Sequence, residues 1–184
     1  MALVVLLGGA RSGKSRLAVE LAAAGGGEAV VVVTAEARDA EMRRRIEAHR
    51  AERPAGWTTV EEPVALEAAL GAVEDDRVVV VDCLSLWAAN LLERGATEEA
   101  ILAAAGTAAA TAADRSGLTV AVSNEVGLGV VPATPLGRAY RDLLGAVNRT
   151  WVAAAARAAL VVAGRALPLQ DARALLAPPG EGLP

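Results

Sequence analysis

Apolar residues follow two patterns along this chain. Short continuous runs bounded by turn-forming residues predict strands that are buried on both faces, as in a parallel sheet covered by helices. These runs are Leu3–Leu7, Ala29–Val33, Val78–Val81, Leu118–Val122 and Ala159–Val162, with Trp57–Val60 as a weaker candidate. Apolar residues at helical spacing predict helices at Lys14–Ala24, Asp39–Glu52, Val64–Val73, Leu84–Glu93, Glu98–Asp114 and Leu136–Ala156. This alternation predicts an α/β, doubly wound fold with a mostly parallel sheet.

Length, charge and cysteine content narrow the class of protein. The 184 residues suit a single domain, which we place at residues 1–170, and we expect the tail at 171–184 to be loosely ordered because it lacks periodicity. The net charge of −4 without a long basic run argues against nucleic acid as a partner. No apolar stretch is long enough to predict a membrane span. Cys83 is the single cysteine, which excludes an internal disulfide and suits the cytoplasm.

A glycine-rich segment joins the first predicted strand to the first predicted helix. It matches the phosphate-binding pattern G-x-x-x-x-G-K-[ST] and consists of Gly8, Gly9, Ala10, Arg11, Ser12, Gly13, Lys14 and Ser15. Backbone N–H groups of such a loop point at phosphate oxygens, and the helix N-terminus adds partial positive charge. Lys14 is the only lysine beside seventeen arginines. We expect Lys14 to reach the β- and γ-phosphates and the Ser15 hydroxyl to ligate Mg²⁺.

Polar residues follow several predicted strands where a parallel sheet binds ligands, at the carboxyl ends. They include Thr34-Ala35-Glu36, Asp82, and the segment that begins Ser123-Asn124-Glu125. Asp82 ends an aliphatic strand, where it could hold Mg²⁺, usually through water, or cap the following helix. Asn124 and Glu125 could belong to the site or close a turn. The residues alone leave these alternatives open.

The single histidine, His49, lies in a predicted helix. Met42, Ile46, His49 and Arg53 fall on one face of that helix. A histidine on such a stripe is more often packed in a core than catalytic. However, Arg50 and Arg53 flank it, and arginines bind phosphates through paired N–H donors. An imidazole is largely neutral at pH 7, because its ordinary pKa is about 6.5, so it can attack phosphorus directly. Spacing does not decide between these two roles.

Several segments together resemble one enzyme family. Besides the glycine-rich loop they are Asp39-x-Glu41-Met42 with Arg45-Ile46 and His49, Arg53-Pro54-x-x-Trp57-x-Thr59-x-Glu61, Asp82-Cys83-Leu84 with Trp87 and Asn90, Ser123-Asn124-Glu125-Val126-Gly127-x-Gly129-Val130-Val131-Pro132, and Tyr140-Arg141-Asp142 with Gly145 and Asn148. The chain resembles the bifunctional adenosylcobinamide kinase/adenosylcobinamide-phosphate guanylyltransferases of cobalamin biosynthesis. The resemblance covers roughly residues 1–170.

The resemblance implies two reactions on one corrinoid substrate. Adenosylcobinamide is phosphorylated with ATP or GTP, and GMP is then transferred from GTP through a guanylylated histidine, which maps onto His49. The resemblance also implies Lys14 as the second catalytic residue and Mg²⁺ as the cofactor. The implied nucleotide contacts are Gly8 to Ser15, Thr34, Ala35, Glu36, Arg50, Ala51, Glu52, Arg53, Glu61 and Asp82. The family also implies a P-loop NTPase with a RecA-like sheet and assembly as a homotrimer.

Two departures and two alternatives accompany the resemblance. Some relatives carry a second histidine where this chain has Ala48, and the family often has a basic Leu-Lys where this chain has Leu169-Gln170. One alternative is a P-loop kinase of small molecules that lacks nucleotidyl transfer, with His49 structural. The other is a nucleotide-dependent switch or binding protein. A GTPase switch would normally carry an Asn-Lys-x-Asp motif that binds guanine. This chain cannot contain that motif, because Lys14 is its only lysine.

Overall fold

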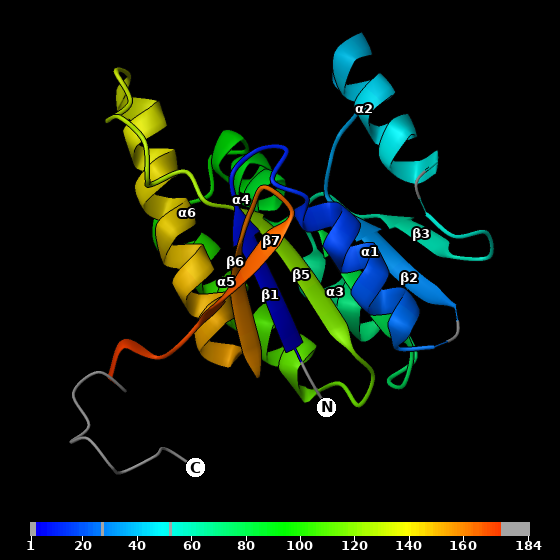
Figure 1. Ribbon diagram of the computed structural model, residues 1–184. Helices are drawn as coiled ribbons and strands as arrows, with labels where there is room; N and C mark the ends of the chain where they lie inside the picture. The colour runs from blue at the N-terminus through cyan, green and yellow to red at the C-terminus, as the bar shows by residue number, and fades with distance from the viewer. Residues whose placement is uncertain (1–2, 27, 52, 174–184) are drawn as a thin grey trace.

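The computed structural model describes residues 3–26, 28–51 and 53–173 (Figure 1). Within these residues the strands form a seven-stranded sheet in the order β3-β2-β4-β5-β1-β6-β7. The strands are β1 Leu3–Gly8, β2 Ala29–Val33, β3 Thr58–Glu61, β4 Val78–Asp82, β5 Thr119–Asn124, β6 Arg157–Val162 and β7 Arg165–Leu169. The helices are α1 Lys14–Ala24, α2 Ala40–Ala51, α3 Leu66–Gly71, α4 Leu84–Glu93, α5 Glu98–Asp114 and α6 Pro135–Ala154. All strand pairs are parallel except β6 with β7, which confirms the predicted α/β class.

Helices cover the two faces of the sheet unequally. One face packs against α3, α4, α5 and α6, and its core contains Trp87 and Trp151, both almost fully buried. The other face packs mainly against α1 through Ala18 and Ala22. Helix α2 stands away from the sheet beyond its carboxyl edge (Figure 1). Among the described residues, no helix combines the length and apolarity that a membrane crossing requires.

The order of the central strands brings three chain segments together. Strand β5 lies between β1 and β4, and the parallel register pairs Gly8 of β1 with Asn124 of β5. On the other side of β5, Asp82 of β4 pairs with Val122. The glycine-rich loop, Asn124 and Asp82 therefore follow neighbouring strands at one edge of the sheet, where parallel sheets bind ligands.

Two differences separate the predicted elements from the observed ones. Strand β7 was not predicted, and it returns antiparallel to β6 through a turn in which Ala163 and Gly164 have φ of 50° and 74°. Positive φ at both residues is typical of a tight two-residue hairpin turn. The predicted helix at 64–73 is shorter at both ends; before its first residue, Glu62 Oε1 accepts hydrogen bonds from the Val64 and Ala65 amides.

Candidate active site

The glycine-rich loop curls tightly between β1 and α1. Gly8 has φ of 154°, and a Cβ atom at this position would lie 2.3 Å from the Val161 carbonyl oxygen. Gly13 has φ of 97° and precedes the first residue of α1. The Gly164 amide in the β6–β7 turn donates a hydrogen bond of 2.8 Å to the Ser12 carbonyl oxygen. The hairpin that the sequence did not predict therefore supports the loop from outside.

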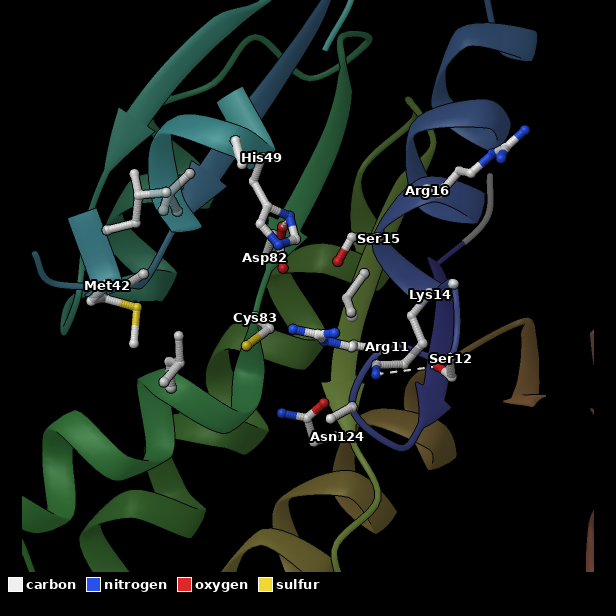
Figure 2. Close-up of a pocket in the computed structure, with 18 of the residues that line it drawn as sticks. Arg11, Ser12, Lys14, Ser15, Arg16, Met42, His49, Asp82, Cys83 and Asn124 are labelled. Atoms are coloured by element: carbon white, nitrogen blue, oxygen red, sulfur yellow. Dashed lines mark hydrogen bonds and ion pairs between the residues drawn. The ribbon is translucent and has the colours of Figure 1, made fainter. Parts of the chain in front are cut away.

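Lys14 lies across this loop. Its side chain is 7% exposed, and Nζ donates a hydrogen bond of 2.7 Å to the Gly9 carbonyl oxygen. Nζ also lies 3.4 Å from Ser12 Oγ, the contact drawn as a dashed line in Figure 2. The one lysine of the chain thus sits within the concave side of the loop, where a bound phosphate would meet it.

A pocket of about 630 Å³ opens at the carboxyl edge of the sheet. Its walls come from the glycine-rich loop, from α2 and from the ends of the central strands. It is lined by Ala10, Arg11, Ser12, Gly13, Lys14, Ser15, Arg16, Val33, Ala35, Met42, Arg44, Ile46, Ala48, His49, Arg53, Asp82, Cys83, Leu86, Val122 and Asn124. Segments far apart in sequence therefore share one cavity.

Helix α2 contributes one of its faces to this pocket. Met42, Ile46 and His49 of α2 and Arg53, which follows the helix, all line it and are all half-buried, so the predicted common face is confirmed for the three residues that lie within the helix. The helix begins after Asp39, whose Oδ1 accepts a hydrogen bond of 2.7 Å from the Met42 amide. That is the contact of a helix N-cap.

His49 points from α2 into the pocket. Its Nδ1 lies 3.8 Å from Asp82 Oδ2, and Figure 2 shows the imidazole directed toward Asp82 and Ser15. The side chain is 33% exposed. The imidazole is therefore accessible from the cavity instead of being enclosed in either core of the sheet.

Arg53 adds a partly buried cation to the same pocket. Its Nη1 donates a hydrogen bond of 3.0 Å to Thr59 Oγ1. Burial lowers the pKa of Arg53; the Asp82 carboxylate opposes this shift and Arg50 adds to it. An arginine remains charged under such conditions, so Arg53 can bind an anion here.

Ser15 and Asp82 supply oxygen donors on facing walls of the pocket, and both point into the space below His49 (Figure 2). Mg²⁺ prefers oxygen ligands and keeps several waters, so two such donors suit it. Among the described residues, no group of three or more His, Cys, Asp or Glu side chains could hold a metal ion. The donor set therefore fits a cation that is held largely by water and phosphate, and not a metal enclosed by protein ligands.

Several residues that the sequence assigned to the nucleotide do not line the cavity. They are Gly8, Gly9, Thr34, Glu36, Arg50, Ala51 and Glu61, while Glu52 falls outside the residues that the structure describes. Thr34 is fully buried, where its Oγ1 donates to the Cys83 carbonyl oxygen at 2.6 Å and accepts from the Cys83 amide at 3.0 Å. Its side chain connects the ends of β2 and β4.

Glu36 belongs to an ion-pair network beside the pocket. Arg94 and Arg38 bind its carboxylate at 2.6 Å and 2.5 Å. These hydrogen bonds, from Arg94 first and then Arg38, lower the pKa of Glu36. Arg38 also pairs with Glu93 and donates a hydrogen bond of 2.9 Å to Asn90 Oδ1. The network joins the segment that leads into α2 to helix α4.

Other residues of the cavity were not assigned to the site from sequence. Arg44, Leu86 and Val122 line it, and no motif marks them. Asn124 also lines it; from sequence, this residue at the end of a predicted strand could belong to the site or close a turn.

Residues 4–169 match the family described as "Cobinamide kinase / cobinamide phosphate guanyltransferase". The chain belongs to this family. It is 44% identical over 173 residues to "Bifunctional adenosylcobalamin biosynthesis protein CobP" of Pseudomonas aeruginosa, covering 90% of this chain and 96% of that protein. It is 36% identical over 165 residues to "Bifunctional adenosylcobalamin biosynthesis protein CobU" of Escherichia coli, covering 83% and 91%.

A solved structure supports the fold. A prototypical ATPase from the type III secretion system of pathogenic bacteria aligns with a TM-score of 0.56 at 12% identity, covering 86% of this chain and 50% of that chain. At this identity the likeness concerns the fold alone. Together with the family match it confirms an α/β P-loop architecture. The family match confirms the enzyme family that the sequence motifs predicted.

Proposed function

We propose that this member of the cobinamide kinase / cobinamide phosphate guanyltransferase family catalyses two consecutive steps of cobalamin biosynthesis. It phosphorylates adenosylcobinamide with ATP or GTP, and then transfers GMP from GTP to give adenosylcobinamide-GDP and pyrophosphate. The family match and the names of the two relatives support the pair of activities. The observation that carries the proposal is the position of the sole histidine, His49, in the pocket of the phosphate-binding loop.

The kinase step uses the glycine-rich loop. A substrate hydroxyl oxygen forms a bond to the γ-phosphorus, the bond from that phosphorus to the β,γ-bridging oxygen breaks, and the nucleoside diphosphate leaves. The hydroxyl proton goes to water or to a phosphoryl oxygen. Lys14 and the backbone N–H groups of the loop stabilise the negative charge on the phosphoryl oxygens. Catalysis here consists of positioning and electrostatic stabilisation by groups that the fold holds in place.

The guanylyl step proceeds through His49. Its Nδ1 lies 3.8 Å from Asp82 Oδ2; in this proposal the neutral ring carries its proton on Nδ1, and the lone pair of Nε2 attacks the α-phosphorus of GTP. The bond from that phosphorus to the α,β-bridging oxygen breaks and pyrophosphate leaves. A phosphate oxygen of the phosphorylated corrinoid then attacks the guanylyl phosphorus, the P–N bond breaks, and His49 is regenerated. Asp82 stabilises the positive charge of the ring while it carries the guanylyl group.

Mg²⁺ is the proposed cofactor of both steps, with Ser15 and Asp82 as the residues that would hold it, the latter usually through water. When bound, Mg²⁺ neutralises charge on phosphate oxygens. The remaining proposed nucleotide contacts are Gly8 to Ser15, Thr34, Ala35, Glu36, Arg50, Ala51, Glu52, Arg53, Glu61 and Asp82. Because the side chains of Thr34 and Glu36 are engaged within the protein, contacts from this segment would be made by its main chain.

The experiment that tests the proposal follows label from GTP that is labelled at the α-phosphate. Protein is incubated with Mg²⁺ and this GTP, denatured, and assayed for attached label. We expect label that is stable in base and lost in acid, as for a phosphoramidate, and we expect none in His49→Asn, which keeps corrinoid phosphorylation. Label of the same amount on His49→Asn would refute the histidine mechanism. Corrinoid phosphorylation without any label on the native protein would indicate a P-loop kinase that lacks nucleotidyl transfer.

Two further features, the oligomeric state and the location, belong to the proposal. We propose a homotrimer, as the family resemblance implies. The segment between β5 and α6 exposes Leu128, Val130 and Val131 by 81%, 95% and 67%, and exposed apolar groups of this kind favour subunit contacts. Light scattering measures the mass directly. We also propose a cytoplasmic location, where nucleoside triphosphates are plentiful and the buried thiol of Cys83 stays reduced.

A further inference from the structure

Asn124 occupies a central position in the pocket. It is the last residue of β5, the strand that separates the phosphate-loop strand β1 from the Asp82 strand β4. Its side chain is half-buried and lines the cavity. In Figure 2 it lies on the side opposite His49, with Arg11 reaching over it from the glycine-rich loop. An acceptor molecule approaching the end of a loop-bound triphosphate would meet this side chain.

Buried groups fix the orientation of the Asn124 amide. Its Nδ2 donates a hydrogen bond of 3.0 Å to Ser85 Oγ. Ser85 is 1% exposed, and its Oγ lies 2.9 Å from Cys83 Sγ, while its carbonyl oxygen accepts a hydrogen bond of 3.0 Å from the Tyr140 hydroxyl. The main chain is held as well, since Asn148 Nδ2 donates to the Asn124 carbonyl oxygen at 3.0 Å.

This arrangement leaves one group of Asn124 for a ligand. With Nδ2 bound to a buried hydroxyl, Oδ1 is directed toward the cavity and toward Arg11 (Figure 2). An amide oxygen only accepts hydrogen bonds. The ligand group that suits it is a hydrogen-bond donor, such as an alcohol.

We infer that Asn124 binds and orients the acceptor hydroxyl of the kinase step. This inference rests on the proposed function and adds a contact for the second substrate. Asn124 Oδ1 accepts a hydrogen bond from the hydroxyl while the hydroxyl oxygen attacks the γ-phosphorus, the bond from that phosphorus to the bridging oxygen breaks, and the diphosphate leaves. Asn124 takes no proton; the proton passes to water or a phosphoryl oxygen. Orientation of the attacking group is a main contribution that a protein makes to phosphoryl transfer.

The test compares two half-reactions in Asn124→Ala. Corrinoid phosphorylation requires the acceptor contact, so its kcat/KM should fall by about tenfold to a hundredfold. Guanylylation of His49 by GTP requires no acceptor, so label from GTP should remain at the native level. Ser85→Ala is the second variant: it keeps Oδ1 but lets the amide rotate, and we expect a loss of only about threefold to tenfold in the kinase step.

Three outcomes decide the inference. Native corrinoid kinetics in Asn124→Ala would overturn it. An equal loss of kinase activity and of GTP labelling in both variants would also overturn it, because it would place the residues in nucleotide binding or folding. Selective loss of the kinase step supports it. Failure of the native protein to phosphorylate the corrinoid would instead refute the proposed function, so the two failures are distinguishable.

Discussion

Asn90 holds the segment that leads to the histidine-bearing helix. It lies on α4 and is 4% exposed. Its Nδ2 donates hydrogen bonds to the carbonyl oxygens of Thr34 at 2.7 Å and Pro63 at 3.1 Å, and its Oδ1 accepts one from Arg38 at 2.9 Å. Asn90→Ala therefore detaches two connecting segments of the chain from α4 at once.

The expected loss of stability follows from these contacts. Each buried carbonyl left without a donor costs about 1–3 kcal/mol, so the two together should lower the free energy of unfolding by about 2–6 kcal/mol. For a domain of this size, each kcal/mol lowers Tm by about 2–4 °C. The shift in Tm should therefore be roughly 4–24 °C.

Asn148→Ala is the matched control. Asn148 is also 4% exposed, but it donates one hydrogen bond, and its Oδ1 has no partner among the described residues. The substitution removes a contact and also removes an unpaired buried oxygen, so we expect a loss of about 1 kcal/mol or less. The contrast separates the hydrogen bonds of Asn90 from the general effect of shortening a buried asparagine.

Urea denaturation measures the free energy of unfolding of both variants, and the labelling assay measures how much guanylylation of His49 each variant retains. Because Thr34 and Arg38 precede α2, Asn90→Ala should reduce guanylylation of His49 more than corrinoid phosphorylation, at a temperature where the variant is folded. A loss of stability no larger than that of Asn148→Ala would refute the assignment of the Asn90 bonds. Equal reductions of both activities would refute its role in positioning α2.

Three shorter predictions concern other residues. Lys14→Ala should abolish both activities, measured as corrinoid phosphorylation and label from GTP, because the triphosphate loses a cation that the loop surrounds. Arg38→Ala should lower guanylylation of His49 more than kinase activity, whereas Arg141→Ala, which removes a pair with Asp142 on α6, should change neither. Burial raises the pKa of the Cys83 thiol, so the unfolded state loses this proton first as pH rises. Urea denaturation between about pH 7.5 and pH 9.5 should therefore show falling stability that Cys83→Ala does not share.

The sequence predicted the core of the sheet because its central strands are continuous aliphatic runs. Strand β7 escaped detection for physical reasons. Its residues Arg165–Leu169 are all exposed, it contains Pro168, and its turn is Ala163-Gly164 in place of the usual Asn-Gly or Asp-Gly. A proline is tolerated there because an edge strand leaves some N–H positions unpaired. What makes this segment a strand is its pairing with β6, which local sequence does not show.

The candidate site also contains some features that the sequence could predict and others that it could not. The phosphate-binding loop and the common face of Met42, Ile46 and His49 depend on local spacing, so sequence could predict them. The partners of Glu36 and Asn124 depend on long-range contacts: Arg94 is fifty-eight residues from Glu36, and Ser85 is thirty-nine from Asn124. Spacing within one segment carries no information about such partners.

The positions of His49 and Asn124 argue for a single pocket that serves both reactions. His49 enters from α2 and Asn124 lies on the opposite side (Figure 2). A triphosphate on the loop would offer its α-phosphorus to one and its γ-phosphorus to the substrate hydroxyl at the other. GTP with a non-hydrolysable β,γ-bridge should therefore support labelling of His49 and inhibit the kinase step competitively with ATP. GTP with a non-hydrolysable α,β-bridge should still donate its γ-phosphoryl group but leave His49 unlabelled. Inhibition of the kinase step that excess ATP does not relieve would show two separate nucleotide sites, and would refute the shared pocket.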